Sequence, residues 1–282
     1  ILDFSSAYAA FISSVKAHNY VSANHVKPAK PEMSELEAIG RYRLPVIRKP
    51  KVIVCYFEPS HAPVMDFSRP SIEAYAKKCD ADLIELTGVF HHAWAMCDKW
   101  RMSSIAWNYD RALLIDSDIL ISENAPDIFE SFPKDSCQFA GVDEMAHYTF
   151  NWWQQEATEF YRSQGLDIPL PTVGINAGVM LFNDIDTMCQ IYAEPELPYA
   201  KQWCVEQFAL WHKLQSVKVT LMDSKWNWAH IRKDFESGLS EAYILHFNGF
   251  KIVQERLSRM REIQLKVFKC VSNSSHVNSK CA

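Results

Sequence analysis

The stretch Tyr109–Ile121, with the sequence YDRALLIDSDILI, decides the fold. Its centre, Arg111–Ile115, is nearly all apolar, as is typical of a strand that is buried on both faces of a parallel sheet. Asp116 and Asp118 follow that strand directly, and a second apolar run follows the two aspartates. In open α/β sheets, ligands bind beyond the carboxyl ends of the strands. The stretch therefore predicts a buried strand that ends at a ligand site.

Strand-like and helix-like runs alternate on both sides of this stretch. We expect strands at 51–57, 82–86, 111–115, 137–142 and 178–182, and helices at 68–78, 97–108, 199–214 and 253–268. This alternation predicts an α/β fold with a Rossmann-like, mainly parallel sheet that is flanked by helices. We expect one such domain over 51–252, preceded by a helical or irregular extension over 1–50, where several prolines interrupt regular structure, and followed by a C-terminal helix and tail over 253–282.

Composition excludes several classes of protein. The chain has 282 residues, of which 48% are hydrophobic and 22% charged, and this is ordinary globular composition. The net charge of −5 gives no basic field, so we expect no nucleic-acid partner. No glycines are spaced G-x-G and no Walker loop occurs, which excludes the usual dinucleotide and P-loop sites. No apolar run approaches the roughly 20 residues of a transmembrane helix.

The eight cysteines include no C-x-x-C pair, and several lie inside apolar runs. We therefore expect a chain without a zinc ribbon and with its cysteines reduced, with a Cys270–Cys281 pair as the alternative at the polar end. The cytoplasm is the favoured compartment. The Golgi lumen is the alternative, if a signal or anchor was trimmed ahead of Ile1.

The pattern Asp-x-Asp occurs three times, at 80–82, 116–118 and 184–186. The first precedes a predicted strand, and the third resembles the capped start of a helix. Only the second lies between two apolar runs at the carboxyl end of a buried strand. Two carboxylates placed there repel each other unless a cation lies between them, and their oxygens suit Mg²⁺ or Mn²⁺. The alternative is a turn with capping aspartates.

His246 follows another short apolar run and is itself followed by Gly249 and Lys251. A histidine in this position is often a hydrogen-bonded structural residue. A site for a metal-bound diphosphate would instead use all three residues. The histidine would bind the metal, the glycine would permit close approach of the backbone, and the lysine would contact phosphate.

These motifs, in their order and spacing, resemble those of GT-A glycosyltransferases of the glycogenin and lipopolysaccharide galactosyltransferase type, a family-8-like group. The resemblance covers roughly Lys51 to Lys251. The pieces that carry it are Lys99 in CDKWRM, Tyr109–Leu120, Ile175–Asn183, Glu206–Leu210 and His246–Gly249.

The resemblance implies a GT-A fold and a set of roles. Asp116, Asp118 and His246 match the protein ligands of Mn²⁺, for which Mg²⁺ is the alternative. The implied catalytic residues are Gln207, whose amide lies near the anomeric carbon, with Asp143 and Glu206 as carboxylates beside the sugars. The implied donor-binding residues are Tyr56, Phe57, Lys99, Asp116, Asn176, Ala177, Gly178, Gly249 and Lys251.

The sequence departs from the family pattern in three places. Lys251 comes one residue early and no Pro-Trp follows it, Glu206 replaces an Asp, and the first strand lacks the Asp-x-x-Tyr that usually follows it. These departures predict a divergent branch of the family. The identity of the donor sugar therefore cannot be carried over from the family to this chain.

The function implied is metal-dependent transfer of a hexose or pentose from a nucleotide-diphosphate sugar, with a UDP-sugar expected, to a glycan or other hydroxyl acceptor. Because the leaving diphosphate can take the acceptor's proton on the same face, we expect retention of configuration. Two alternatives stay open. They are a sugar-1-phosphate nucleotidyltransferase and a non-catalytic sugar- or partner-binding module on the same scaffold.

Overall fold

The computed structural model describes residues 48–87, 102, 106, 108–145, 152–165, 173–193 and 205–274. Within these ranges the side chains of 152–154, 157, 189, 190, 192, 193, 205, 206, 208, 209 and 268–274 are not described. All the described residues belong to one compact unit, Ile47–Ala282.

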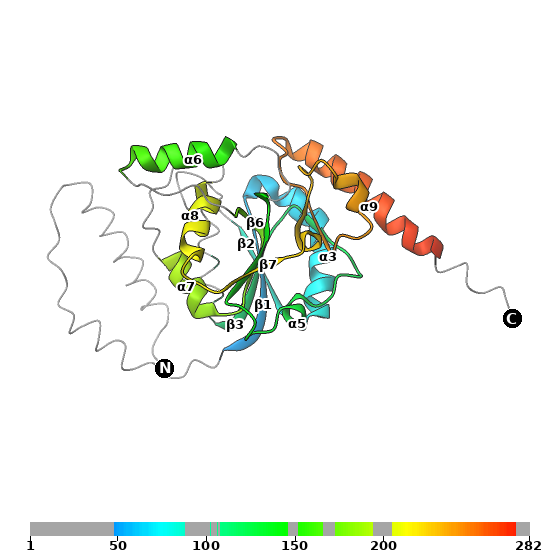
Figure 1. Ribbon diagram of the computed structural model, residues 1–282. Helices are drawn as coiled ribbons and strands as arrows, with labels where there is room; N and C mark the ends of the chain where they lie inside the picture. Colours follow the sequence, from blue (N-terminus) through cyan, green and yellow to red (C-terminus); the bar gives the residue numbers. More distant parts are fainter. Residues whose placement is uncertain are drawn as a thin grey trace. The chain divides into compact units, whose positions relative to one another are not determined.

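Strands and helices alternate along the described chain (Figure 1). The strands are β1 (Lys49–Phe57), β2 (Asp82–Thr87), β3 (Tyr109–Asp116), β4 (Ile119–Ile121), β5 (Phe139–Asp143), β6 (Ile175–Phe182), β7 (Val219–Met222), β8 (Trp228–Ala229) and β9 (Ile244–His246). The helices are α3 (Ala62–Lys78), α5 (Ile128–Ser131), α6 (Trp152–Ser163), α7 (Ile185–Ala193), α8 (Val205–Leu214) and α9 (Val253–Ser274), with short 3-10 turns η1 (Pro59–His61), η4 (Ser224–Asn227) and η5 (Phe235–Gly238).

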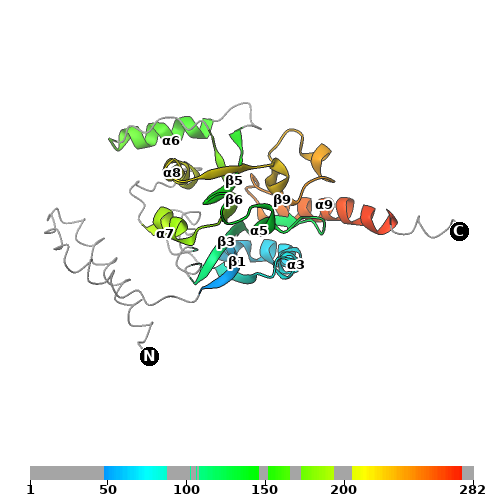
Figure 2. The same ribbon diagram turned by 60° about the horizontal axis from the view of Figure 1, so that its bottom comes forward.

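The main sheet has the strand order β2-β1-β3-β6-β5-β7. Five of its strands run in one direction, whereas β6 is antiparallel to both of its neighbours. This confirms the predicted mainly parallel sheet. A smaller sheet, β4-β9-β8, lies beside it. Figures 1 and 2 show α3 and α5 over one face of the main sheet and α7 and α8 over the other.

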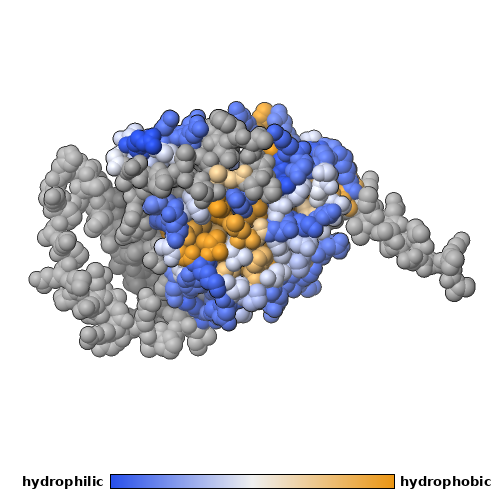
Figure 3. Space-filling view, viewed as in Figure 1, coloured by the Kyte–Doolittle hydropathy of each residue, from blue (hydrophilic) through white to orange (hydrophobic). Residues whose placement is uncertain are grey.

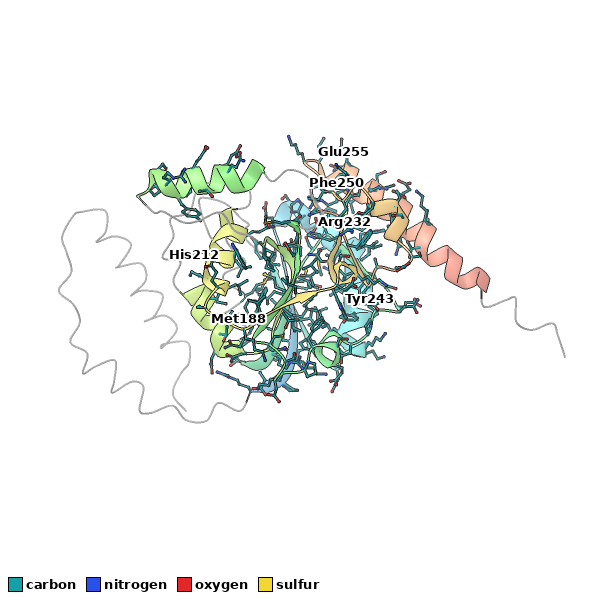
Figure 4. The ribbon with its side chains drawn as sticks, in the orientation of Figure 1. Met188, His212, Arg232, Tyr243, Phe250 and Glu255 are labelled. Carbon is teal, nitrogen blue, oxygen red and sulfur yellow. The ribbon has the colours of Figure 1, made fainter. Side chains whose placement is uncertain are left out.

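The apolar strands are explained by burial on both faces. Leu113 of β3 belongs to a cluster with Met65 of α3, while its neighbour Leu114 belongs to a second cluster with Met188 of α7. Figure 4 shows Met188 on one side of the sheet and Tyr243 on the other. Each fully buried leucine contributes about 1.5–3 kcal/mol, so an apolar residue is favoured at consecutive positions of the strand.

Several predicted boundaries shift in the structure. Helix α3 begins at Ala62 rather than Ser68, because Pro63 lies in the first turn, where its missing N–H leaves no hydrogen bond unmade. Ser68 is therefore a buried interior residue. Helix α9 extends to Ser274 instead of ending at 268. The helix predicted at 97–108 and the first part of that at 199–214 lie largely outside the described residues.

The direction of β6 decides which residues meet at one edge of the main sheet. Tyr56 near the end of β1 is in register with Asp116 at the end of β3. Because β6 is antiparallel, its first residue, Ile175, lies at this same edge and pairs with Asp143 at the end of β5. The carboxyl ends of the five parallel strands and the beginning of β6 therefore share one edge.

On the face viewed in Figure 3, apolar side chains gather around the middle, flanked by hydrophilic ones. The edge strand β7 contributes an exposed apolar residue to the surface, Leu221, with 49% of its area accessible. None of the helices that the structure describes has the length and apolar character needed to cross a membrane.

Candidate metal centre

Three potential metal ligands converge just beyond the end of β3. The Nε2 atom of His246 lies 3.6 Å from Oδ2 of Asp116 and 3.4 Å from Oδ1 of Asp118. One ligand atom from each residue lies within 4.8 Å of the other two. The Asp118 and His246 side chains are buried, while Asp116 is partly exposed. Among the described residues this is the one group of three or more such side chains with metal-binding spacing.

The small sheet brings the histidine to the aspartates. Strands β4 and β9 are antiparallel, with Ile119 opposite His246, and the Phe247 N–H donates to the Asp118 carbonyl at 2.8 Å. A strand that begins one residue after Asp118 therefore pairs with the strand that ends in His246. This backbone pairing holds the ligands from two distant segments in register.

Gly178 of β6 leaves the space that the imidazole occupies. A Cβ atom added at Gly178 would overlap Cε1 of His246, and would lie 2.6 Å from its Nδ1 and 2.9 Å from Oδ1 of Asn176. Any larger residue would force the ring or the strand to move. The glycine is thus required by close approach of a side chain.

A chain of hydrogen bonds fixes the tautomer of His246. The Gly178 N–H donates to Oδ1 of Asn176 at 2.8 Å, and Nδ2 of Asn227 donates to that same oxygen at 2.9 Å. The remaining Oδ1 of Asn227 therefore faces Nδ1 of His246, at 2.9 Å, and must accept a hydrogen from it. In the neutral imidazole the lone pair is then on Nε2, directed toward both carboxylates.

The donor set fits a divalent cation of the Mn²⁺ or Mg²⁺ type. Two carboxylates and an imidazole nitrogen are three acceptors with no donor among them, which is unfavourable in a buried position without a cation. Oxygen ligands suit Mg²⁺ and Mn²⁺, and imidazole is accepted by Mn²⁺ as by other transition metals. A buried amide that fixes the ligand tautomer is the kind of supporting contact that metal-binding histidines have.

Arg256, in the first turn of α9, also reaches the site. Its Nη1 lies 3.1 Å from Oδ2 of Asp118, and its Nη2 donates to the carbonyl of Phe250 at 2.9 Å. Its Nε is buried and has no hydrogen-bond partner among the described residues. Figure 4 shows Phe250 near Glu255, which lies next to Arg256 in the sequence, at the start of α9. One oxygen of Asp118 therefore faces His246 and the other faces a cation.

No protein-family model matches the chain, and no curated protein sequence matches it significantly. Solved structures do match. A glycosyltransferase involved in glycosylating the major capsid of PBCV-1 superposes with a TM-score of 0.51 and 14% identity over 76% of this chain and 99% of that one. The chain has a GT-A fold. Galactosyltransferase LgtC, in complex with donor and acceptor sugar analogues, matches with a TM-score of 0.45 and 12% identity over 76% and 95% of the two chains. Mouse xyloside xylosyltransferase 1 matches with a TM-score of 0.41 and 13% identity over 71% and 98%.

Four of the residues expected to hold the donor, Tyr56, Phe57, Asn176 and Ala177, lie at or near the same edge of this GT-A sheet. Asn176 and Ala177, at the start of β6, are both buried. Tyr56 and Phe57 are also buried, and their rings pack into the hydrophobic clusters on opposite faces of the sheet. Their predicted grip on the base and ribose stays a prediction.

The loop after β9 has a backbone conformation that favours glycine at position 249. Gly249 has a φ of +85°, which strains other residues, and a Cβ there would overlap Ile231. Lys251 is exposed and forms no ion pair with any other described residue. Lys99, expected near the diphosphate, lies outside the described residues.

Of the three predicted catalytic residues, Gln207 has the most distinctive environment. The side chain is buried on α8, and its Oε1 has no hydrogen-bond partner among the described residues. Asp143 uses Oδ1 to accept hydrogen bonds from the N–H groups of Met145 and Gly174, both at 3.0 Å. The side chain of Glu206 lies outside the described residues.

Sequence reasoning missed Arg256 and Asn227. Each carried a weak signal. A cation in the first turn of a helix opposes the helix dipole and therefore indicates a compensating anion, here Asp118. Asn227 is a polar residue between two tryptophans, Trp226 and Trp228, in a segment that is buried. Neither signal names the partner.

Proposed function

We propose that this chain is a metal-dependent glycosyltransferase. It would transfer a hexose or pentose from a nucleotide-diphosphate sugar, specifically a UDP-sugar, to a glycan or another hydroxyl acceptor with retention. The observation that carries this proposal is the convergence of Asp116, Asp118 and the Nε2 lone pair of His246 at the carboxyl edge of a GT-A sheet. The structural matches have low sequence identity to this chain and support only its fold. The proposed function therefore rests on the residues of this site.

The ligand residues would hold Mn²⁺, or Mg²⁺ as the alternative, between the protein and the diphosphate. Asp116 and Asp118 supply oxygen, His246 supplies nitrogen, and Asn227 keeps Nε2 of His246 unprotonated by accepting from Nδ1. The bound cation would neutralise charge on the departing diphosphate. Without it, two carboxylates would face an anionic ligand.

Gln207 would stabilise the reacting sugar. Its buried Oε1 lacks a hydrogen-bond partner among the described residues, which is costly unless a ligand completes the site. An amide oxygen cannot take a proton at neutral pH, but it can stabilise positive charge that develops at the anomeric carbon. That role fits retention, with the leaving diphosphate accepting the proton of the acceptor. Asp143 or Glu206 acting as a general base would instead give inversion.

A panel of nucleotide sugars tests the donor class. We expect UDP-sugars to raise the melting temperature of the protein only when Mn²⁺ is present, and one of them to release UDP when a hydroxyl acceptor is added. Asp186→Ala is a matched control, since it alters an Asp-x-Asp pattern elsewhere. Stabilisation by nucleotide sugars in EDTA, or release of pyrophosphate from UTP and a sugar phosphate, would contradict the proposal. Binding without turnover of any donor would favour the non-catalytic alternative.

The stereochemistry is tested on the product. NMR assignment of the first-formed glycosidic bond, made from an α-linked donor, should show an α linkage. Gln207→Ala should lower kcat strongly, on the order of a hundredfold, with nearly unchanged UDP affinity. A β-linked product would refute the retaining mechanism and direct attention to Asp143 and Glu206.

A further inference from the structure

The contact between Arg256 and Asp118 places a fixed cation inside the candidate metal centre. The two groups are 3.1 Å apart, and the Arg256 and Asp118 side chains are 11% and 8% exposed. Salt screens a pair this buried only weakly. The positive charge of Arg256 therefore acts on any ion that binds next to it.

The same guanidinium joins the site to the loop after β9. Nη2 of Arg256 donates to the carbonyl of Phe250, in the loop that also contains Gly249. This loop is where the resemblance predicted a lysine on phosphate, yet Lys251 is exposed and forms no ion pair within the described part of the chain. Within the described part of the chain, Arg256 is a cation that contacts one of the candidate metal ligands, Asp118.

The guanidinium also retains an unused donor. Its Nε is buried and meets no acceptor in the regions that the structure describes. A buried N–H without a partner is unfavourable, because it has lost its hydrogen bond to water. Its place in the first turn of α9 opposes the helix dipole as well. Both costs would be offset by an anion that bound beside Asp118.

We propose that Arg256 is a positioning residue that couples metal binding to diphosphate binding. This inference rests on the proposed function. Arg256 holds Oδ2 of Asp118, so that Oδ1 alone faces His246 and the cation. Its charge weakens the binding of the metal by itself and strengthens the binding of the diphosphate that follows.

The sign of each effect follows from the charges. With a neutral His246, Asp116, Asp118 and Arg256 together carry −1, so that a divalent cation brings the site to +1 and favours an anion. Without Arg256 the same three ligands and cation sum to zero. Because like charges repel, the guanidinium beside Asp118 would oppose a cation bound by the same carboxylate, and we expect this to weaken Mn²⁺ affinity about tenfold. By linkage, metal and diphosphate each strengthen the other by the same factor.

The test measures binding without turnover. Mn²⁺ affinity is obtained from the EPR signal of free Mn²⁺ with no nucleotide, and UDP affinity by calorimetry at saturating Mn²⁺. Arg256→Gln removes the charge but keeps a hydrogen-bond donor for Phe250, whereas Arg256→Lys keeps the charge. Arg259→Gln is the matched control, because Arg259 lies on the same helix and pairs with Glu236 and Glu262.

We expect Arg256→Gln to bind Mn²⁺ about tenfold more tightly and UDP at least tenfold more weakly. Arg256→Lys should stay closer to the wild type in both, and Arg259→Gln should match it. Parallel losses of both affinities, no change in either, or a lysine variant that behaves like the glutamine variant would each overturn the coupling role. If Arg256→Gln does not fold by circular dichroism, Arg256→Met is compared with Arg256→Lys on the same criteria. A wild-type protein that binds no Mn²⁺ would instead refute the proposed function.

Discussion

Two tripeptides with the same pattern, Asp116-Ser117-Asp118 and Asp184-Ile185-Asp186, each follow a strand of the main sheet and have opposite environments. The first faces the Nε2 lone pair of His246, and its Asp118 also pairs with Arg256. The second meets hydrogen-bond donors. Because β6 is antiparallel to β3, the two tripeptides also lie at opposite edges of the sheet. The direction of one strand thus separates a candidate metal site from a helix cap.

Asp184 is a helix cap, as predicted, and its carboxylate accepts hydrogen bonds from backbone and side-chain donors. Its Oδ1 accepts from the N–H of Asp186 at 3.2 Å, and its Oδ2 accepts from the Thr187 hydroxyl and more weakly from Nε2 of Gln138. Asp186 is not a cap, which corrects the expectation for this residue. It lies in the first turn of α7 and pairs with Arg48 at 2.8 Å. Among the described residues, the two tripeptides therefore differ in that an imidazole nitrogen faces both carboxylates of the first and neither carboxylate of the second.

Removing a ligand carboxylate should give the largest difference between the two tripeptides. Asp118→Asn should lower Mn²⁺-dependent UDP-sugar turnover by on the order of a hundredfold or more, because a charged ligand is lost at the leaving group. Asp186→Asn, the matched change in the other tripeptide, should leave turnover and Mn²⁺ affinity unchanged. Measured kcat and Mn²⁺ titrations compare them. Equal losses in the two variants would remove the distinction drawn between the tripeptides.

Gly178→Ala tests the close approach that admits His246. The new Cβ would overlap the imidazole ring, so His246 must move away from the two carboxylates. We expect Mn²⁺ affinity to fall more than tenfold, a loss in the range seen when supporting contacts of metal ligands are removed. Titration of Mn²⁺ against the folded variant measures this, with circular dichroism as a check on folding. An unchanged affinity would show that the ring position does not depend on this glycine.

Asn227→Leu tests the tautomer of His246. Without an acceptor for Nδ1–H, the ring is free to place its hydrogen on Nε2, so Mn²⁺ affinity should fall about ten- to hundredfold. Gln138→Ala is the matched control, since it removes an amide that contacts the Asp184 cap instead. It should lower stability without altering Mn²⁺ affinity. If both amide variants bind Mn²⁺ like the wild type, the amide of Asn227 does not support the metal site.

The smallest expected effect is on stability, at Asp184. Burial would raise the pKa of this carboxyl, but hydrogen bonds from Thr187, Gln138 and two backbone N–H groups outweigh burial and hold the pKa below its usual value. Asp184→Ala should cost about 1 kcal/mol at pH 7, as for other helix caps.

The pH dependence of that cost has a definite sign. Since the folded pKa is depressed, the contribution of Asp184 is fully present above its unfolded value of ~3.9 and is lost as the pH falls through the folded pKa. Urea unfolding of wild type and Asp184→Ala at pH 7 and below pH 4 should therefore show a difference that shrinks in acid. A difference that grew in acid would contradict the cap assignment.

Much of the fold could be predicted because local pattern controls it. Runs such as Val52–Phe57 and Ala112–Ile115 are apolar at consecutive positions, which is typical of a strand buried on both faces, and the strands they predicted are present. The Asp116–Asp118 tripeptide could be selected from the three Asp-x-Asp tripeptides because the apolar runs on both sides of it predict strands. The third ligand, His246, came from the order of motifs in the resemblance, since no local pattern connects it with the aspartates.

The sequence by itself thus predicted the main strands β1, β2, β3, β5 and β6 and the helices α3 and α9, and it selected Asp116 and Asp118 as candidate ligands. Only the tertiary structure decided that β6 is antiparallel, that Asn227 sets the tautomer of His246 and that Arg256 contacts Asp118. The reason is physical. A strand's neighbours in the chain specify its burial, whereas the direction of its pairing and the hydrogen-bond partner of a buried side chain depend on segments that meet it only after folding.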